Sequence, residues 1–291
     1  MKLVTFSTAG SEPRVGVVDG EDVVDVRAVD DRLPARMEDF LEAGADARAA
    51  AEAADSGAPR IALTDVTLHS PLLRPPKILA VGLNYADHVA EAGMDTPSIP
   101  MIFNKQSTSA HGPFEPFHRP RVSDKLDYEG ELAIVIGRRC RHVPRDRAGE
   151  VIAGYTVCND VSVRDWQMRS ATFTMGKSFD THCPLGPWIV TADELGDPHR
   201  LQIRTWVNGE LRQDSNTKHL IFDCFDLVEH LSTAFTLEPG DVIPTGTPGG
   251  VGAAMKPRQY LVAGDRVRIE IEGIGAIENE VVEEPADTML V

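Results

Sequence analysis

The sequence contains few cysteines, and none are paired at a metal-ligand spacing. Its four cysteines, at positions 140, 158, 183 and 224, form no C-x-x-C motif. This argues against a cysteine-based metal site, and we expect four free thiols in a reducing compartment. No stretch approaches about 18 uninterrupted apolar residues, and the start, Met1 to Phe6, lacks the apolar core of a signal peptide. We therefore expect a cytoplasmic protein without a membrane partner.

Positive charge is also scarce. The chain of 291 residues has 29 lysines and arginines against 45 acids, which gives a net charge of -16. Such a chain repels phosphate backbones, so nucleic acid is not an expected partner.

Two glycine-containing segments lack the parts that phosphate-binding motifs need. Gly176-Lys177-Ser178 has no upstream glycine, because Ala171 stands at that position. In the segment 245–252, Pro248 leaves no room for the helix of a dinucleotide fingerprint. The glycines there are better explained as residues that let the backbone approach a small ligand closely. The hydroxyl of Thr247 is a candidate hydrogen-bond donor to that ligand.

Acidic residues, in contrast, are placed as metal ligands would be. Residues 132–136 alternate in a pattern that predicts a half-buried strand, so Glu129 and Glu131 just before it project from one face. Asp160 ends the next strand-like run, 152–158, and is a candidate third ligand. Oxygen ligands favour Mg²⁺, Mn²⁺ or Ca²⁺. The alternative is a pair of solvent-facing acids on an edge strand.

The N-terminal 70 residues are expected to form a small α/β unit, and residues 71–291 the catalytic domain. Strands are predicted near 2–7, 14–19 and 22–27, followed by a surface helix over 37–54 that is interrupted near Gly44. Asp19-Gly20 is a typical hairpin turn. The prolines at 71, 75 and 76 mark the boundary.

Polar side chains in the predicted catalytic domain suggest a site for a small acid. On a helix over 84–91, His88 and Glu91 share a face, where the carboxylate orients the imidazole. Lys105 is a candidate for contacting an anionic substrate, with a solvated lysine as the alternative. Ser162 to Asp165 has the form of a capping box.

A second set of candidate contacts follows Asp160. Arg164 and Gln167 share a helix face there, suited to bind a substrate carboxylate. Arg164 could instead pair with nearby acids. Farther on, we predict a strand over 201–207, a hairpin turn at Asn208-Gly209, a helix over 220–236 and a strand over 267–271.

Five blocks resemble the fumarylacetoacetate hydrolase family, in that family's order and from about Pro76 to Val281. The blocks lie at 81–91, 127–131, 159–167, 176–181 and 237–252, and the end of the matching region, 275–279, resembles the family's terminal signature. The resemblance implies a β-rich α+β fold with a mixed β-roll or sandwich, and a homodimer.

The resemblance also implies roles for individual residues. Glu129, Glu131 and Asp160 would hold the divalent cation, and Lys177 would lie beside it to stabilise an enolate. His88 and Glu91 would form a water-activating dyad on a mobile lid, whose flexible part would be residues 93–100.

These expectations lead to a metal-dependent hydrolase that cleaves a C–C bond in a small anionic 2-oxo or 1,3-dicarbonyl acid, of the acylpyruvate or fumarylpyruvate type. An oxaloacetate-type decarboxylase, an enol–keto isomerase or a 2-hydroxyhepta-2,4-diene-1,7-dioate isomerase on the same site is the nearest rival. A ligand-binding protein without turnover is disfavoured by the intact acids and Lys177.

Overall fold

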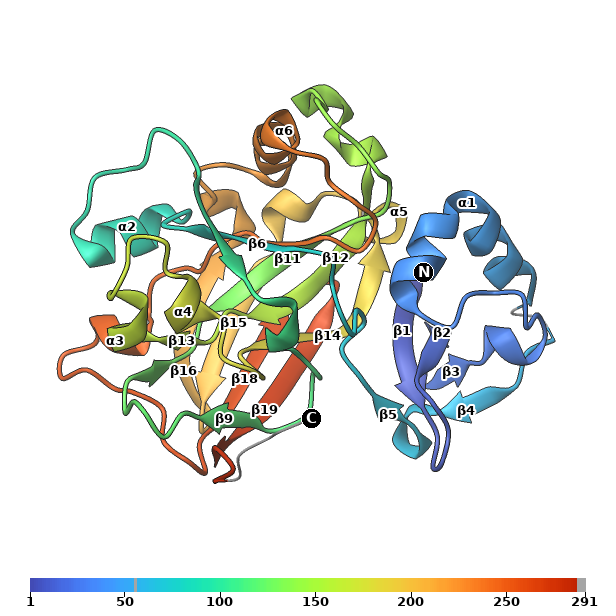
Figure 1. Cartoon of the computed structure of the whole chain (residues 1–291), viewed down its shortest axis with the longest axis horizontal. Helices are drawn as coiled ribbons and strands as arrows, with labels where there is room; N and C mark the ends of the chain where they lie inside the picture. The colour runs from blue at the N-terminus through green and yellow to red at the C-terminus, as the bar shows by residue number, and fades with distance from the viewer. Residues whose placement is uncertain (55–56, 287–291) are drawn as a thin grey trace.

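The computed structural model of the protein describes residues 1–54 and 57–286, and its centre is a large mixed sheet (Figure 1). Strand β5 (Thr67–Leu68) pairs with β1 of this sheet, and β8 (Ala110–His111) with β14. From edge to edge the main strands are β4 (Arg60–Ala62), β3 (Asp22–Val24), β2 (Arg14–Asp19), β1 (Lys2–Ser7), β14 (Cys183–Thr191), β12 (Ile152–Asn159), β11 (Gly130–Ile136), β17 (Val242–Pro244), β6 (Ile78–Gly82) and β7 (Met101–Lys105).

A second sheet packs against the large one. Its inward residues alternate with outward polar ones, as in β15, where Ile203, Thr205 and Val207 are buried. A two-stranded ladder joins β10 (Leu126–Asp127) to β13 (Ser162–Val163). The order of the second sheet is β16 (Glu210–Asn216), β15 (Gln202–Val207), β18 (Arg266–Ile271), β19 (Gly275–Glu283) and β9 (Phe117–Arg119).

Apart from α1, the helices are short, and all lie outside the sheets, so the chain has the β-rich α+β fold that the sequence predicts. Asp223 caps α6 with a capping box, and residues 220–222 lie outside this helix, so the predicted helix over 220–236 is too long. The helices are α1 (Met37–Ala54), α2 (Ala86–Ala92), α3 (Arg164–Gln167), α4 (Thr174–Lys177), α5 (Ala192–Leu195) and α6 (Cys224–Ala234). None of the described helices is long and apolar enough to cross a membrane.

The N-terminal unit has the predicted elements and continues the large sheet. Strand β3 ends at Val24 rather than 27, because residues 26–28 form a 3-10 turn. Helix α1 is interrupted at Gly44, which has φ 63°. The hairpin at Gly20 is also as predicted. Strand β1 pairs with β14, so this unit, at the right of Figure 1, shares hydrogen bonds with the rest of the chain. Its treatment as a separate domain stays a prediction.

The strand that carries the candidate ligands is buried on both faces, so the prediction of a half-buried strand is wrong. Leu132 and Ile134 pack into the core shared with the second sheet. Ala133 and Val135 pack into the core that α1 and the N-terminal strands form. Strand β11 therefore lies in the middle layer of the molecule, between these two cores.

His182 is a buried histidine that couples stability to pH. Its Nε2 contacts the carbonyl oxygen of His118 at 2.7 Å, and its Nδ1 has no hydrogen-bond partner among the described residues. Burial disfavours the imidazolium and lowers the pKa of His182 to about 3.

We expect His182→Gln to make unfolding less sensitive to pH. Below an unfolded pKa of about 6.5, His182 is protonated in the unfolded chain but stays neutral in the folded protein. The free energy of unfolding of the parent therefore decreases as the pH falls toward about 3. Between pH 7 and pH 5 this contribution is about 2 kcal/mol. Urea unfolding at both pH values measures it, with the exposed His230→Gln as control. An unchanged pH dependence in His182→Gln would contradict the assignment.

Candidate active site

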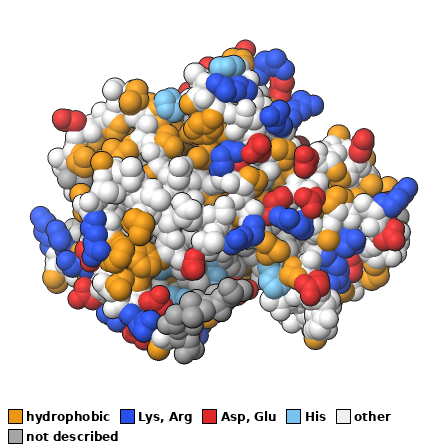
Figure 2. Space-filling view, in the orientation of Figure 1, with side chains coloured by type: hydrophobic (Ala, Val, Ile, Leu, Met, Phe, Trp, Pro, Cys, Tyr) orange, Lys and Arg blue, Asp and Glu red, His pale blue; other side chains and the backbone are white. Residues whose placement is uncertain are grey.

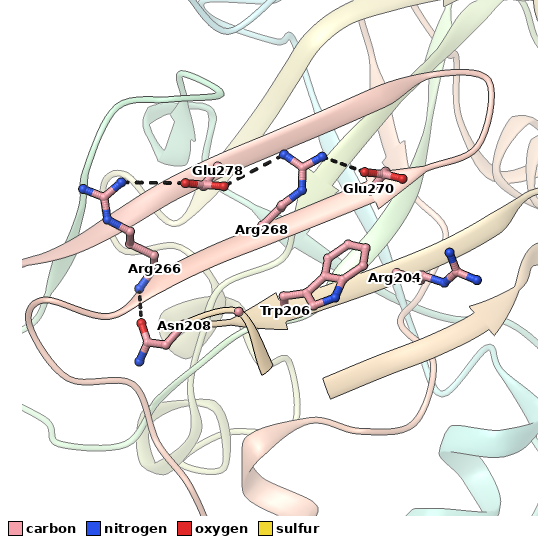
Figure 3. Close-up of a pocket in the computed structure, with 8 residues that line it drawn as sticks. Arg204, Trp206, Asn208, Arg266, Arg268, Glu270 and Glu278 are labelled. Carbon is pink, nitrogen blue, oxygen red and sulfur yellow. Dashed lines mark hydrogen bonds and ion pairs between the residues drawn. The ribbon is translucent and has the colours of Figure 1, made fainter. Parts of the chain in front are cut away.

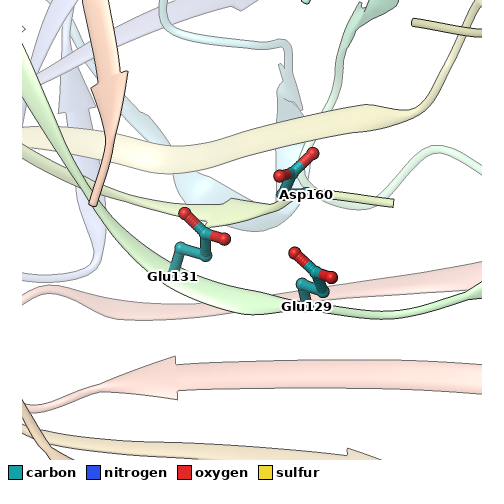
Figure 4. Close-up of side chains that lie close together, drawn as sticks. All are labelled: Glu129, Glu131 and Asp160. Carbon is teal, nitrogen blue, oxygen red and sulfur yellow. The ribbon is translucent and has the colours of Figure 1, made fainter. Parts of the chain in front are cut away.

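Three carboxylates meet where β11 and β12 lie side by side. Glu131 pairs in register with Cys158, and the backbone N–H of Asp160 donates to the carbonyl of Glu129 at 2.9 Å. One oxygen from each of Glu129, Glu131 and Asp160 lies within 4.8 Å of the others, and all three residues are buried. Figure 4 shows Glu129 and Glu131 projecting from the same side of their chain segment toward Asp160, which lies on a neighbouring segment. The alternative of solvent-facing acids on an edge strand is wrong.

Position 130, between the two glutamates, requires glycine because the second sheet packs closely against it. A Cβ at this position would lie 2.4 Å from Oγ1 of Thr205 on β15. The backbone N–H of Gly130 donates to Oε1 of Gln213 at 3.0 Å, which fixes the strand against the second sheet. The two glutamates therefore project away from the second sheet, and toward the lysines of β7 and α4.

Two lysines neutralise part of this cluster. Nζ of Lys177 lies 2.7 Å from both Oε2 of Glu129 and Oδ2 of Asp160. Nζ of Lys105 lies 2.7 Å from Oδ1 of Asp160 and also donates to the carbonyl of Lys177. Both lysines are buried, so the alternative of a solvated Lys105 is wrong. A contact of Lys105 with substrate stays a prediction.

Glu131 has no cationic partner among the described residues. One carboxylate oxygen accepts the N–H of Gly246 at 2.7 Å. Burial, with the charges of Asp160 and Glu129, raises the pKa of Glu131 well above its usual range. For Glu129, burial acts in the same direction, but the charges of Lys177 and Arg164 outweigh it and lower the pKa to about 2. An oxygen-only set with one unneutralised carboxylate suits a hard divalent cation.

Arg164 is held by acids of the protein. Its guanidinium contacts Asp127 at 2.8 Å and Glu129 at 2.5 Å, and Nη1 donates to Oε1 of Gln167 at 3.1 Å. Arg164 and Gln167 share a face as predicted, and the pairing with nearby acids is present; contact with a substrate carboxylate stays a prediction. The predicted capping box is wrong, because Ser162 lies in β13 and donates to the carbonyl of Asp160.

Asp127 is a site residue that the sequence interpretation did not single out. Besides Arg164, its carboxylate accepts the backbone N–H groups of Gly252 and Ala253, each at 2.9 Å. It thereby attaches the 251–260 segment beside the cluster. Its position in the sequence, two residues before Glu129, was the feature from which its place in the site could have been predicted.

His88 and Glu91 form the predicted pair on α2. Nδ1 of His88 lies 3.3 Å from Oε2 of Glu91, and the N–H of Gly250 donates to Oε1 of Glu91 at 2.9 Å. Both residues line a pocket of about 790 Å³ together with Arg164 and Gln167. Residues 93–100 have no helix or strand, and motion of this segment stays a prediction.

Thr247 lies close behind the cluster. Its hydroxyl donates to the carbonyl of Gly130 at 3.0 Å and accepts from Nε2 of Gln213 at 2.8 Å. The hydroxyl proton is thus used within the protein, and a donor role toward a ligand stays a prediction.

Comparison with known proteins shows the family of the chain. Residues 77–282 match the family described as "Fumarylacetoacetate (FAA) hydrolase C-terminal". The chain belongs to the fumarylacetoacetate hydrolase family. A curated relative, oxaloacetate tautomerase fahd2, mitochondrial, of Xenopus laevis, is 45% identical over 288 residues, covering 97% of this chain and 90% of that protein.

Solved structures of related enzymes have the same fold. Maleylpyruvate hydrolase from Sphingobium sp. SYK-6, in complex with manganese(II) and pyruvate, is 36% identical with a TM-score of 0.82, covering 98% of this chain and 100% of that one. The 5-carboxymethyl-2-hydroxymuconate delta-isomerase of Mycobacterium smegmatis is 38% identical with a TM-score of 0.78, at 98% and 100% coverage. The chain is therefore an enzyme of this family.

We expect Glu131→Gln to weaken binding of Mg²⁺ and Mn²⁺ by about tenfold or more, because it removes the charge of the carboxylate that no lysine neutralises. Isothermal titration calorimetry measures the affinity, and the exposed Glu42→Gln is a matched control. Equal affinities of Glu131→Gln and the parent would remove Glu131 from the ligand set.

We expect Lys177→Met to make the protein depend on a divalent cation for stability. Loss of the ammonium removes one of the two cations that contact each of the buried carboxylates Glu129 and Asp160, which costs up to about 3 to 5 kcal/mol of unfolding free energy. Mn²⁺ should restore stability more in Lys177→Met than in the parent, since the ion no longer competes with the lysine charge. Urea unfolding with and without Mn²⁺ tests this, with the exposed Lys218→Met as control. Equal stabilisation of parent and variant would contradict it.

Proposed function

We propose that this enzyme interconverts the enol and keto forms of a small 2-oxo acid of the oxaloacetate type. The observation that carries the proposal is the His88–Glu91 pair, which lines the same pocket as Arg164 beside the cluster of carboxylates and lysines. The name of the Xenopus laevis relative, at 45% identity over nearly the whole chain, supports this reaction and this substrate type.

His88 is suited to move a proton to and from carbon. Glu91 accepts the hydrogen bond from Nδ1, so the proton lies there and Nε2 carries the free lone pair. The N–H of Gly250 fixes Glu91 and thereby the ring. Nε2 can take the proton from the carbon beside the oxo group and return it, which is general acid–base catalysis.

Positive charge beside the pocket favours the enolate that this proton transfer produces. Lys177 supplies a buried ammonium, and it keeps Glu129 and Asp160 together. A divalent cation held by Glu129, Glu131 and Asp160, Mg²⁺ or Mn²⁺ with Ca²⁺ as a further candidate, would polarise the oxo group as a Lewis acid.

C–C hydrolysis of an acylpyruvate or fumarylpyruvate is the second candidate. In that reaction Nε2 of His88 would take a proton from water instead of carbon. Two observations favour it: the likeness to maleylpyruvate hydrolase over 98% of the chain, and a pocket of about 790 Å³, which is larger than a four-carbon acid requires.

We expect His88→Ala to slow enol–keto interconversion of oxaloacetate by about 10²- to 10⁴-fold, the usual contribution of a general acid–base residue, while Mn²⁺ binding is retained. The ultraviolet absorbance of the enol follows the reaction. Any decarboxylation of oxaloacetate should persist, because it needs only the positive charge that stabilises the enolate. His230→Ala, on the exposed face of α6, is the control and should keep the parent rate.

Two outcomes would count against this assignment. Interconversion at the parent rate in His88→Ala would remove His88 from the reaction. If the parent releases pyruvate from fumarylpyruvate faster than it interconverts oxaloacetate, hydrolysis replaces tautomerisation as the reaction of this site.

A further inference from the structure

The active-site pocket contains basic side chains that the reaction described above does not use. Besides His88 and Arg164, the pocket of about 790 Å³ is lined by Lys125, Lys256 and Arg258. Figure 2 shows Lys and Arg side chains gathered at the left edge of the molecule, where α3 and the 251–260 segment lie in Figure 1. The chain has a net charge of -16, so a group of cations in one pocket is a feature to explain.

Backbone hydrogen bonds fix the segments that carry these cations next to the reactive end of the pocket. The N–H of Arg164 donates to the carbonyl of Lys125 at 3.0 Å. The N–H of Leu261 donates to the carbonyl of Leu126 at 2.8 Å, so the end of the 251–260 segment lies beside Lys125. Asp127 holds the start of that segment through Gly252 and Ala253. The three basic side chains therefore lie on segments that are hydrogen-bonded to the segment that carries Glu129.

These three cations are not neutralised by any described residue. Within residues 1–54 and 57–286, no acidic side chain forms an ion pair with Lys125, Lys256 or Arg258. The acids of the pocket have other partners: Glu91 contacts His88 and Gly250, and Asp165 accepts from Oγ of Ser123 at 2.5 Å.

The basic side chains of a pocket on the outer face of the second sheet are, in contrast, paired with acids. This pocket has a volume of about 380 Å³ and contains arginines of β15 and β18 (Figure 3). There Arg268 contacts Glu270 at 2.6 Å, Arg266 contacts Glu280 at 2.9 Å, and Arg204 contacts Asp214 at 3.1 Å. Those arginines are neutralised within the sheet, whereas the active-site cations remain available to a ligand.

We propose that Lys125, Lys256 and Arg258 bind a second carboxylate of the substrate, so that the enzyme selects 2-oxo diacids over 2-oxo monoacids. Arg164 is not available for this role in the structure, because Asp127 and Glu129 occupy its guanidinium. Val251, Ala254 and Met255 also line the pocket and suit the hydrocarbon chain between the two charged ends. The inference rests on the proposed function for the position of the oxo-acid end.

The test compares two six-carbon ligands that differ in one carboxylate. We expect the parent, saturated with Mn²⁺, to bind 2-oxoadipate roughly fivefold or more tightly than 2-oxohexanoate, as exposed ion pairs of this number allow. This preference should weaken as the salt concentration rises. In the double variant Lys256→Gln, Arg258→Gln, in which only Lys125 remains, the preference should fall to about twofold or less, with the affinity for 2-oxohexanoate unchanged. Isothermal titration calorimetry gives both affinities.

A matched control has the same change of charge elsewhere on the surface. The double variant Arg139→Gln, Lys218→Gln removes one arginine and one lysine that do not line this pocket, and it should keep the preference for 2-oxoadipate. A parent without the preference, or a preference that is undiminished by loss of Lys256 and Arg258, would overturn the proposal.

Binding and turnover separate this proposal from the proposed function. If oxaloacetate is interconverted but 2-oxoadipate is not preferred, the second-carboxylate site fails and the reaction stands. If the preference depends on Lys256 and Arg258 but the parent does not act on oxaloacetate, the second-carboxylate site stands and the reaction fails.

Discussion

The burial of three carboxylates at one point of the molecule is the constraint on which the rest of the site depends. Buried carboxylates are costly unless positive charge compensates them. The chain supplies Lys177, Lys105 and Arg164, which reach the cluster from three separate segments and contact Glu129 and Asp160. Because Glu131 has no such partner among the described residues, the same arrangement that stabilises the fold would also leave a place for one divalent cation.

This constraint explains why β11, which carries Glu131, lies in the middle layer. Strand β11 needs one sheet behind it to fix the direction of the glutamates, and Gly130 allows the close approach of Thr205. On its other face it needs the core that α1 and the N-terminal strands complete. The described residues of the N-terminal unit contribute no side chain to the carboxylate cluster, yet they cover the sheet that positions the cluster.

The sequence predicts local features of this molecule better than long-range ones. The i, i+2 spacing of Glu129 and Glu131 and the i, i+3 spacing of His88 and Glu91 are properties of single elements, and the structure has both. The half-buried assignment of β11 failed because alternation of large and small apolar residues does not reveal a second covering layer. The burial of Lys105 could not be predicted either, since its partner Asp160 is 55 residues away.

The proposed chemistry and the proposed selectivity involve different parts of the pocket. Relatives of this chain include a tautomerase, a hydrolase and an isomerase by name, on one fold. All three reactions can pass through an enolate, which positive charge beside the oxo group would stabilise. The group that distinguishes one substrate from another must therefore lie outside the cluster, on the segments that line the pocket. Asp127 links the two regions, because one carboxylate binds both Arg164 and the start of the 251–260 segment. In the proposed mechanism, a change in that segment would alter which acid is bound, while the buried charges proposed to stabilise the enolate would stay in place.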